Sequence, residues 1–213
     1  MKQQPRYAPR RLATITGALM AAMPLTALAQ APTQATYLTA EQIATVNALP
    51  GVDRQIISTD IGKLNLAVGI VHRTAVAARP ISTSAAAAAD QACGTSSAAD
   101  VPGTASGIAH DHQTETYIIT SGSGTLVTGG SILNGRKSAP ESSVTTTLNG
   151  PSCSGVIGGQ GVISRVVKVG DVIVIPANVP HGWSLIEDHV DYLSVRPDPD
   201  RVLARDYVNP ALD

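Results

Sequence analysis

The sequence contains no phenylalanine, and tryptophan and tyrosine together contribute only six of its 213 residues. Without more aromatic side chains, the chain lacks a stacking surface for single-stranded nucleic acid. Charged residues make up only 15% of the chain, which excludes a coiled coil, while 43% hydrophobic residues exclude a disordered protein. The 19 glycines and 14 prolines are typical of a globular protein rich in turns, and the length fits one domain.

Residues 1–29 have the three parts of a secretory signal peptide. An apolar run of modest length follows a head without acidic residues, and Ala27-Leu28-Ala29 forms a small-residue cleavage site. The basic residues of the head are Lys2, Arg6, Arg10 and Arg11. Pro24 and the cleavage site argue against a membrane anchor. We therefore predict an exported protein, periplasmic or secreted. The pair Arg10-Arg11 leaves general and twin-arginine export both open.

Basic charge is scarce in the remainder of the chain, and no later segment is long and apolar enough to cross a bilayer. Four of the 15 lysines and arginines lie before residue 30, but none of the 16 acidic residues does. The predicted mature chain therefore carries a net charge of −5, from 11 basic and 16 acidic residues. This balance disfavours nucleic acid and anionic membranes as partners.

Cysteine is almost absent, with Cys93 and Cys153 as the two examples. Both lie in sequence rich in serine, glycine and alanine, which is typical of loops. In an oxidising compartment they are expected to form a disulfide that joins two long loops. Two unrelated buried thiols are the alternative.

The order of patterns predicts a short N-terminal helix followed by many strands. Residues 30–59 form a leader and a helix, with a capping box at Thr39 and Gln42 and a stop at Pro50. Short apolar-alternating segments then fill residues 60–197, with a turn at 121–124. Two excursions, 79–107 and 131–161, are expected as loops, and a run of alanines in the first could form a short helix. Residues 198–213 form a tail. The expected fold class is all-β, a small antiparallel barrel or sandwich.

Two histidines in HDHQTE are the first candidates for a metal site. On a strand, His110 and His112 would project side by side from one face. Glu115 joins them if the chain bends after His112 and the glutamate begins the next strand. Far along the chain, Pro176 and Pro180 form a rigid corner that presents His181. Imidazoles that converge with a carboxylate predict a transition-metal site.

These segments resemble the two motifs of the cupin family. His110, His112, Glu115 and Gly122 match the H-x-H and E-x6-G parts of the first motif, while Gly170, Pro176 and His181 match the second. The sequence departs from the family at several positions, where Thr104, Asn178 and Leu185 replace the usual residues, and the gap before Glu115 is one residue short. Asparagine tolerates left-handed backbone angles, which makes the change at 178 mild. The resemblance covers roughly residues 60–197.

The resemblance implies a jelly-roll barrel that holds one divalent transition metal ion, iron, manganese, nickel or zinc, through the three histidines and Glu115. It also suggests a homodimer. An ion with open positions would serve an enzyme, an oxygenase or an isomerase or lyase, acting on a small oxygen-rich molecule. The alternative is a non-catalytic periplasmic protein that binds a metal or a small ligand. The sequence names neither the substrate nor a catalytic acid or base.

Other polar and aromatic residues are weaker candidates. Four side chains share a strand face with a candidate ligand or lie on the last strand, so they either line the pocket or pack in the core: Tyr117, Trp183, Tyr192 and Arg196. His72 lies in an apolar strand and is expected to be a core or surface residue. His189 follows Glu187-Asp188 in an expected exposed turn.

Overall fold

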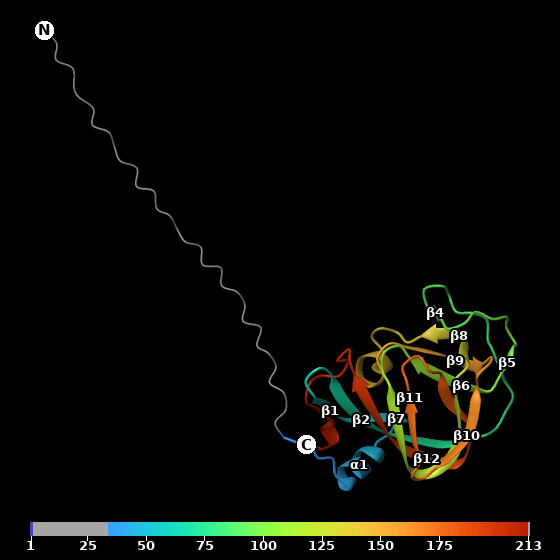
Figure 1. Cartoon of the computed structure of the whole chain (residues 1–213), viewed down its shortest axis with the longest axis horizontal. Helices are drawn as coiled ribbons and strands as arrows, with labels where there is room; N and C mark the ends of the chain where they lie inside the picture. The colour runs from blue at the N-terminus through green and yellow to red at the C-terminus, as the bar shows by residue number, and fades with distance from the viewer. Residues whose placement is uncertain (2–33, 213) are drawn as a thin grey trace.

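The computed structural model describes Met1 and residues 34–212, so the predicted signal peptide falls on residues outside that part (Figure 1). The described chain is an antiparallel barrel, which confirms the all-β prediction. One sheet has the order β13 (Tyr207–Val208), β1 (Asp53–Asp60), β2 (Asn65–Val76), β12 (His181–Asp198), β7 (Glu115–Thr128) and β11 (Val172–Ile175). The other has the order β4 (Ala92–Cys93), β8 (Ser131–Lys137), β9 (Ser152–Gly158), β6 (Ala105–His110), β12, β7 and β10 (Ile163–Lys168).

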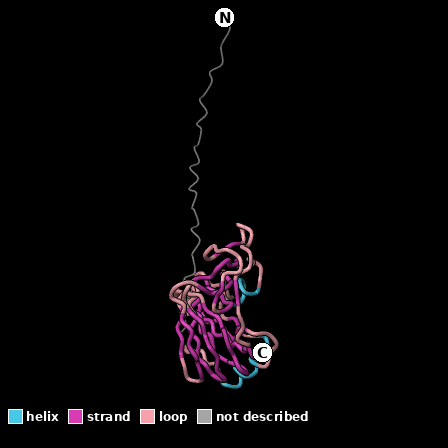
Figure 2. Tube along the Cα trace, turned by 90° about the vertical axis from the view of Figure 1, so that its right-hand side faces the viewer, coloured by secondary structure: helices cyan, strands magenta, loops and turns pink. Residues whose placement is uncertain are grey.

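The two long strands β7 and β12 belong to both sheets and so join them into one barrel. Figure 2 shows that strands make up most of the described chain. The turn expected at 121–124 is wrong, because β7 continues through it as a single strand. Gly122 has φ +66°, and a Cβ there would collide with the His189 carbonyl oxygen, so only glycine fits this irregularity in the pairing. His189 likewise lies within β12 and not in a turn, with its side chain 33% exposed.

Helix α1 (Ala40–Asn47) forms where the capping box predicts it. The Thr39 hydroxyl accepts from the backbone of Gln42, whose side chain accepts from the Thr39 N–H. Val46 then packs on Ile56 of β1 and Ile70 of β2, so the helix covers one face of this strand pair (Figure 1). β1 begins at residue 53, and the sheet therefore starts before the expected boundary at residue 60.

The two excursions contain more strand than predicted. Residues 131–161 were expected as a loop, but they form β8 and β9, joined by a π-helical turn at Val144–Leu148. Small residues lower strand propensity, yet here they let β8 and β9 pack closely: a Cβ on Gly155 would lie 2.8 Å from the Ile132 side chain. In the first excursion the alanine run is not helical, and β3 (Ile81–Ser82) pairs with β5 (Pro102–Gly103).

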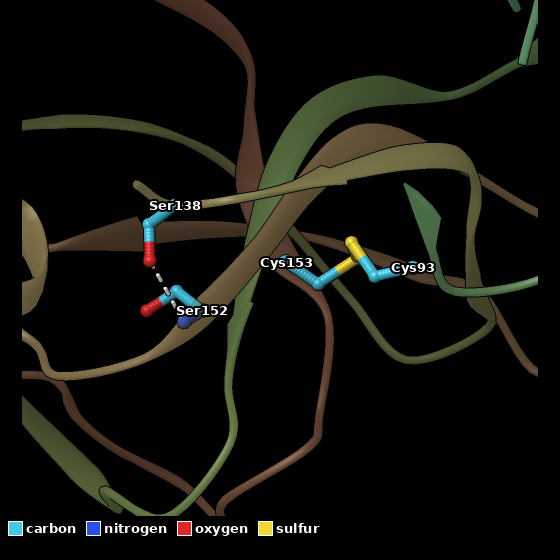
Figure 3. Close-up of a disulfide and its surroundings, with 4 residues drawn as sticks. All are labelled: Cys93, Ser138, Ser152 and Cys153. Atoms are coloured by element: carbon cyan, nitrogen blue, oxygen red, sulfur yellow. Dashed lines mark hydrogen bonds between the residues drawn. A yellow bond between two sulfur atoms is a disulfide. The ribbon is translucent and has the colours of Figure 1, made fainter. Parts of the chain in front are cut away.

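The predicted loop-to-loop disulfide is present between Cys93 of β4 and Cys153 of β9, with 5.9 Å between the Cα atoms (Figure 3). It ties the first excursion to β9. The next residue along β9, Ser152, donates a hydrogen bond from its backbone N–H to the Ser138 hydroxyl at 3.1 Å. Among the described residues, no helix has the length and apolar character needed to cross a membrane.

Asp60 fastens the C-terminal tail to the end of β1. Its carboxylate accepts from the Gly62 N–H at 2.7 Å and pairs with Arg205 at 2.5 Å and Arg201 at 3.5 Å. The Gly62 N–H lowers the pKa of Asp60 most, and the two arginines add to this against the effect of burial.

Because folding lowers this pKa, the contribution of Asp60 is complete above the ordinary value of 3.8 and disappears as pH falls through the folded value. We expect Asp60→Asn to be less stable than wild type near neutral pH, with the difference shrinking below about pH 4. Urea unfolding across this pH range checks the prediction, with the exposed Asp90→Asn as control. A constant difference at all pH values would contradict it.

Candidate metal centre

The chain bends between His110 and Glu115. β6 ends at His110, residues 111 and 112 form a bend, and β7 begins at Glu115. This is the bend that the sequence required if Glu115 was to join His110. The Glu115 side chain, 2% exposed, faces the barrel interior together with the buried Tyr117 on the same strand face.

His181 is the first residue of β12 and follows the corner between β11 and β12. Asn178 has φ +65° in this corner, as its tolerance of left-handed angles predicts. Its backbone N–H donates to the His110 carbonyl at 2.7 Å, and its side chain donates to the Asp111 carbonyl at 3.1 Å. Gly182 follows, and a Cβ there would collide with the Ser106 carbonyl oxygen. Asn178 and Gly182 thus allow the close approach of the corner and β12 to β6.

His110, Glu115 and His181 converge in the barrel interior. Their ligand atoms all lie within 4.8 Å of one another, and all three side chains are buried. Both His110 Nε2 and His181 Nε2 lie 3.0 Å from Glu115 Oε2. Within the part of the chain that the structure describes, no other set of three histidine, cysteine or acidic residues is arranged in this way.

The two oxygens of Glu115 have different partners. Oε1 accepts from Ser194 Oγ at 2.9 Å and from Arg196 Nε at 2.8 Å, while Oε2 accepts from the Tyr117 hydroxyl at 3.0 Å. Burial by itself raises the pKa of Glu115. The Arg196 guanidinium, followed by the two histidines, outweighs burial and holds the pKa well below its ordinary value. The carboxylate is therefore ionised, with Oε2 turned toward the imidazoles.

Hydrogen bonds at the far side of each imidazole fix its tautomer. His181 Nδ1 lies 3.0 Å from the Val179 carbonyl oxygen, which can only accept. His110 Nδ1 lies 3.0 Å from Ser152 Oγ, whose own proton goes to the Gly150 carbonyl at 2.9 Å. Both Nδ1 atoms therefore carry hydrogen, and Nε2 of each ring is the atom that faces Glu115 Oε2.

This arrangement fits a bound cation. Three electron-pair donors face one another in a buried space, and His181 Nε2 has no hydrogen-bond partner among the described residues despite its 3.0 Å approach to Glu115. Histidine ligands usually donate their second N–H to a carbonyl, carboxylate or water, and the Val179 carbonyl matches this pattern.

The two motif regions therefore meet inside an antiparallel barrel of two sheets, at the end of β6 and the starts of β7 and β12. The segment that resembles the first cupin motif supplies His110 and Glu115, and the segment that resembles the second supplies His181.

Comparisons with known proteins add three likenesses in solved structures. No protein-family model and no curated protein matches the chain. An uncharacterised Klebsiella pneumoniae protein with a double-stranded β-helix domain is 13% identical, with a TM-score of 0.38 over 78% of this chain and 93% of that one. The DMSP lyase DddQ from Ruegeria pomeroyi is 12% identical, with a TM-score of 0.34, and the match covers 72% of this chain and 50% of that one. An oxalate oxidase in complex with glycolate is 14% identical, with a TM-score of 0.33, and the match covers 72% of this chain and 54% of that one.

His112 lies apart from the other three candidate ligands. Because β6 ends at His110, the expectation that both rings project from one strand face is wrong. The His112 side chain is 58% exposed, and its Nδ1 contacts the Asp200 carboxylate, which raises the pKa of the imidazole. In this structure the site thus has two histidines and one carboxylate.

A cleft of about 410 Å³ lies beside His181, and Tyr117 and Trp183 are among the residues that line it. Tyr192 packs behind them, with its ring centroid 4.2 Å from that of Tyr117. These three residues are half of the six aromatic residues in the chain. Arg196, also a candidate for the cleft wall, is 1% exposed and holds Glu115 and Asp53 instead.

The two remaining histidines lie away from the site. His72 and His189 lie on the outside of the barrel, where His72 pairs with Asp191 at 2.5 Å and His189 contacts Ser121 at 2.8 Å. The sequence reasoning missed three residues that contact the site or its cleft, Arg73, Ser152 and Ser194. It also missed Asp53, which pairs with Arg196. One signal was available, since polar residues alternate along the end of β12 at buried positions.

Proposed function

We propose that this cupin binds one divalent transition metal ion through His110 Nε2, His181 Nε2 and Glu115 Oε2. The observation that carries the proposal is the convergence of two imidazole nitrogens on one buried carboxylate oxygen, each at 3.0 Å, while a hydrogen bond on the far side of each ring holds Nδ1. Two atoms that each lie about 2.1 Å from one ion at a right angle are about 3 Å apart, in agreement with both contacts.

We further propose that the site is that of an enzyme acting on a small oxygen-rich molecule, an oxygenase or an isomerase or lyase. Two histidines and one carboxylate leave coordination positions open, and the cleft beside His181 has the size of a small-molecule site. A bound divalent ion would supply Lewis acidity, or redox chemistry in the case of iron or manganese. Arg196 and Ser194 hold Oε1, so that Oε2 alone is left for binding.

Tyr117 is the residue best placed to hold a proton beside the site. Its hydroxyl donates to Glu115 Oε2 at 3.0 Å, and its ring lines the cleft. Burial, and then the negative charge of Glu115, raise the pKa of Tyr117 well above its ordinary value. The phenol therefore stays protonated and acts as a donor toward the carboxylate or toward a ligand in the cleft.

Metal analysis of purified variants tests the proposal. We expect about one equivalent of metal in wild type, after loading with iron, manganese, nickel or zinc, and none in His110→Ala or His181→Ala. His112→Ala is the matched control and should keep the metal, because its ring contacts Asp200 outside the barrel. Circular dichroism checks that each variant is folded.

Two results would overturn the metal proposal: no uptake of any of the four metals by wild type, or loss of metal from His112→Ala as well. The alternative function, a periplasmic binding protein that closes every position on the ion, is separated by water proton relaxation of the manganese-loaded protein. Exchange of water with the ion supports the enzyme, whereas its absence favours the binding protein.

Export is part of the proposal. The disulfide between Cys93 and Cys153 supports it, because disulfides form and persist in oxidising compartments. The pattern of residues 1–29 supports it independently through the sequence alone.

A further inference from the structure

Arg73 lies in the wall of the cleft that leads to His181. It is on β2, on the same strand face as the buried Val71, so its side chain is directed toward the barrel interior. Arg73, Tyr117 and His181 all line the same cleft of about 410 Å³. The guanidinium is therefore half-buried within the space next to the proposed metal ligands.

Arg73 differs from other arginines of the barrel in its partners. Arg196 pairs with Glu115 and Asp53, and Arg205 pairs with Asp60. Across residues 34–212, no carboxylate lies within ion-pair distance of Arg73. Its hydrogen bond in this part of the chain runs from Nε to the Tyr192 hydroxyl at 3.1 Å. Both Nη groups are left to interact with a ligand.

The hydrogen bond to Tyr192 also positions the guanidinium. Tyr192 is 1% exposed and packs between Tyr117 and Trp183, with ring centroids 4.2 and 5.7 Å away. A rigid aromatic residue therefore holds Nε, and the planar guanidinium keeps a defined orientation. A pre-oriented donor pair loses less side-chain entropy when it binds an anion.

The rest of the cleft wall offers no negative charge to compete for Arg73. Val76, Ile108 and Trp183 are apolar, and Gly107 and Ser106 are uncharged. Asp53, the carboxylate whose charge acts on Arg73, and Glu115 are both already held by Arg196. An unpaired cation between apolar walls attracts an anion strongly, because water screens it less there than at an open surface.

We propose that Arg73 binds the carboxylate of the substrate and that the substrate of this site is a small organic acid anion. Guanidinium matches carboxylate in a two-point hydrogen-bonded pair, which fixes orientation as well as charge. The remainder of the molecule then extends along the cleft toward His181 and Tyr117. This inference rests on the proposed function for the role of the bound acid as substrate, but the contact with Arg73 forms with or without metal.

Binding of acetate, malonate and succinate, each compared with its uncharged amide, tests the inference. Calorimetry is performed on metal-free protein and on zinc-loaded protein. We expect the carboxylates to bind at millimolar or lower concentrations in both forms, and the amides to bind at least tenfold more weakly. Arg73→Gln should weaken carboxylate binding roughly tenfold to a hundredfold, because it removes a charged hydrogen-bond donor. Arg73→Lys should recover part of the loss.

Arg165→Gln is the matched control, since Arg165 is exposed on β10 outside the cleft, and it should bind the acids as wild type does. The inference is overturned if none of the three acids binds wild type, if the amides bind equally well, or if Arg73→Gln and Arg73→Lys both bind the acids as wild type does. Metal analysis of the same samples separates the two proposals. Wild type that takes up no metal contradicts the proposed function, while the carboxylate preference in metal-free protein still decides the role of Arg73.

Discussion

Replacing Arg196 with methionine is expected to lower the free energy of unfolding by about 3–5 kcal/mol, the cost of removing one partner from a buried ion pair. The side chain is 1% exposed, and methionine retains much of its packing but none of its charge. Glu115, 2% exposed, would lose its strongest charged partner, and Asp53 would lose the 2.5 Å contact with Nη2. Two carboxylates would then lose the one cation that pairs with both of them.

The same arginine also joins distant parts of the barrel. Nη1 donates to Gln55 of β1 at 3.3 Å and to the Leu148 carbonyl of the π-helical turn at 3.2 Å. Nε donates to Glu115 of β7. Its loss therefore removes hydrogen bonds between three segments at once, which places the expected effect far above that of a surface substitution.

Urea unfolding of Arg196→Met beside Arg165→Met measures this effect, and the exposed Arg165 should change stability by less than about 0.5 kcal/mol. The double variant Arg196→Met, Glu115→Gln should be more stable than Arg196→Met, because it no longer buries an unpaired carboxylate. A loss below about 1 kcal/mol in Arg196→Met, or no recovery in the double variant, would contradict the assignment of Arg196 as the partner that stabilises Glu115.

Removal of the disulfide by the double substitution Cys93→Ser, Cys153→Ser is expected to lower the free energy of unfolding by about 4 kcal/mol. The cross-link spans 60 residues, and a loop of this length restricts the unfolded chain strongly. In the folded state it connects β4 to β9, where Ser152 lies next to Cys153 (Figure 3). Ser152 in turn makes the hydrogen bond to His110.

Urea unfolding with and without a thiol reductant checks this expectation. Wild type should lose stability in reductant to about the level of the double variant, and the double variant should be insensitive to reductant. Equal stability of wild type in both conditions would show that the cross-link contributes nothing measurable. A reductant effect on the double variant would show that the reductant acts elsewhere.

The sequence alone determined the features that depend on local pattern. The capping box at Thr39 and Gln42 specified α1, because those two side chains satisfy backbone groups within one turn. Apolar alternation indicated an all-β chain, and two motif spacings brought His110, Glu115 and His181 into one hypothesis. Asn178 was expected to accept a left-handed angle, and it does so because its side chain is compatible with φ +65°.

Other features could not be predicted because they depend on contacts between distant strands. β8 and β9 have weak strand propensity and exist through their pairing with each other and with β6. The course of β7 through Gly122 is set by β12 lying against it. Period-two reasoning placed His112 beside His110, but the strand ends one residue too early for that rule to apply.

The chemical roles of the arginines were decided by tertiary structure alone. Arg73 and Arg196 both lie on strands, and nothing in the local sequence says which acid each of them meets. The fold places Arg196 between Glu115 and Asp53, where it is neutralised, and leaves Arg73 in the cleft without an acid. A guanidinium acts according to the charges within a few ångströms of it, and those charges come from residues more than fifty positions away in the chain.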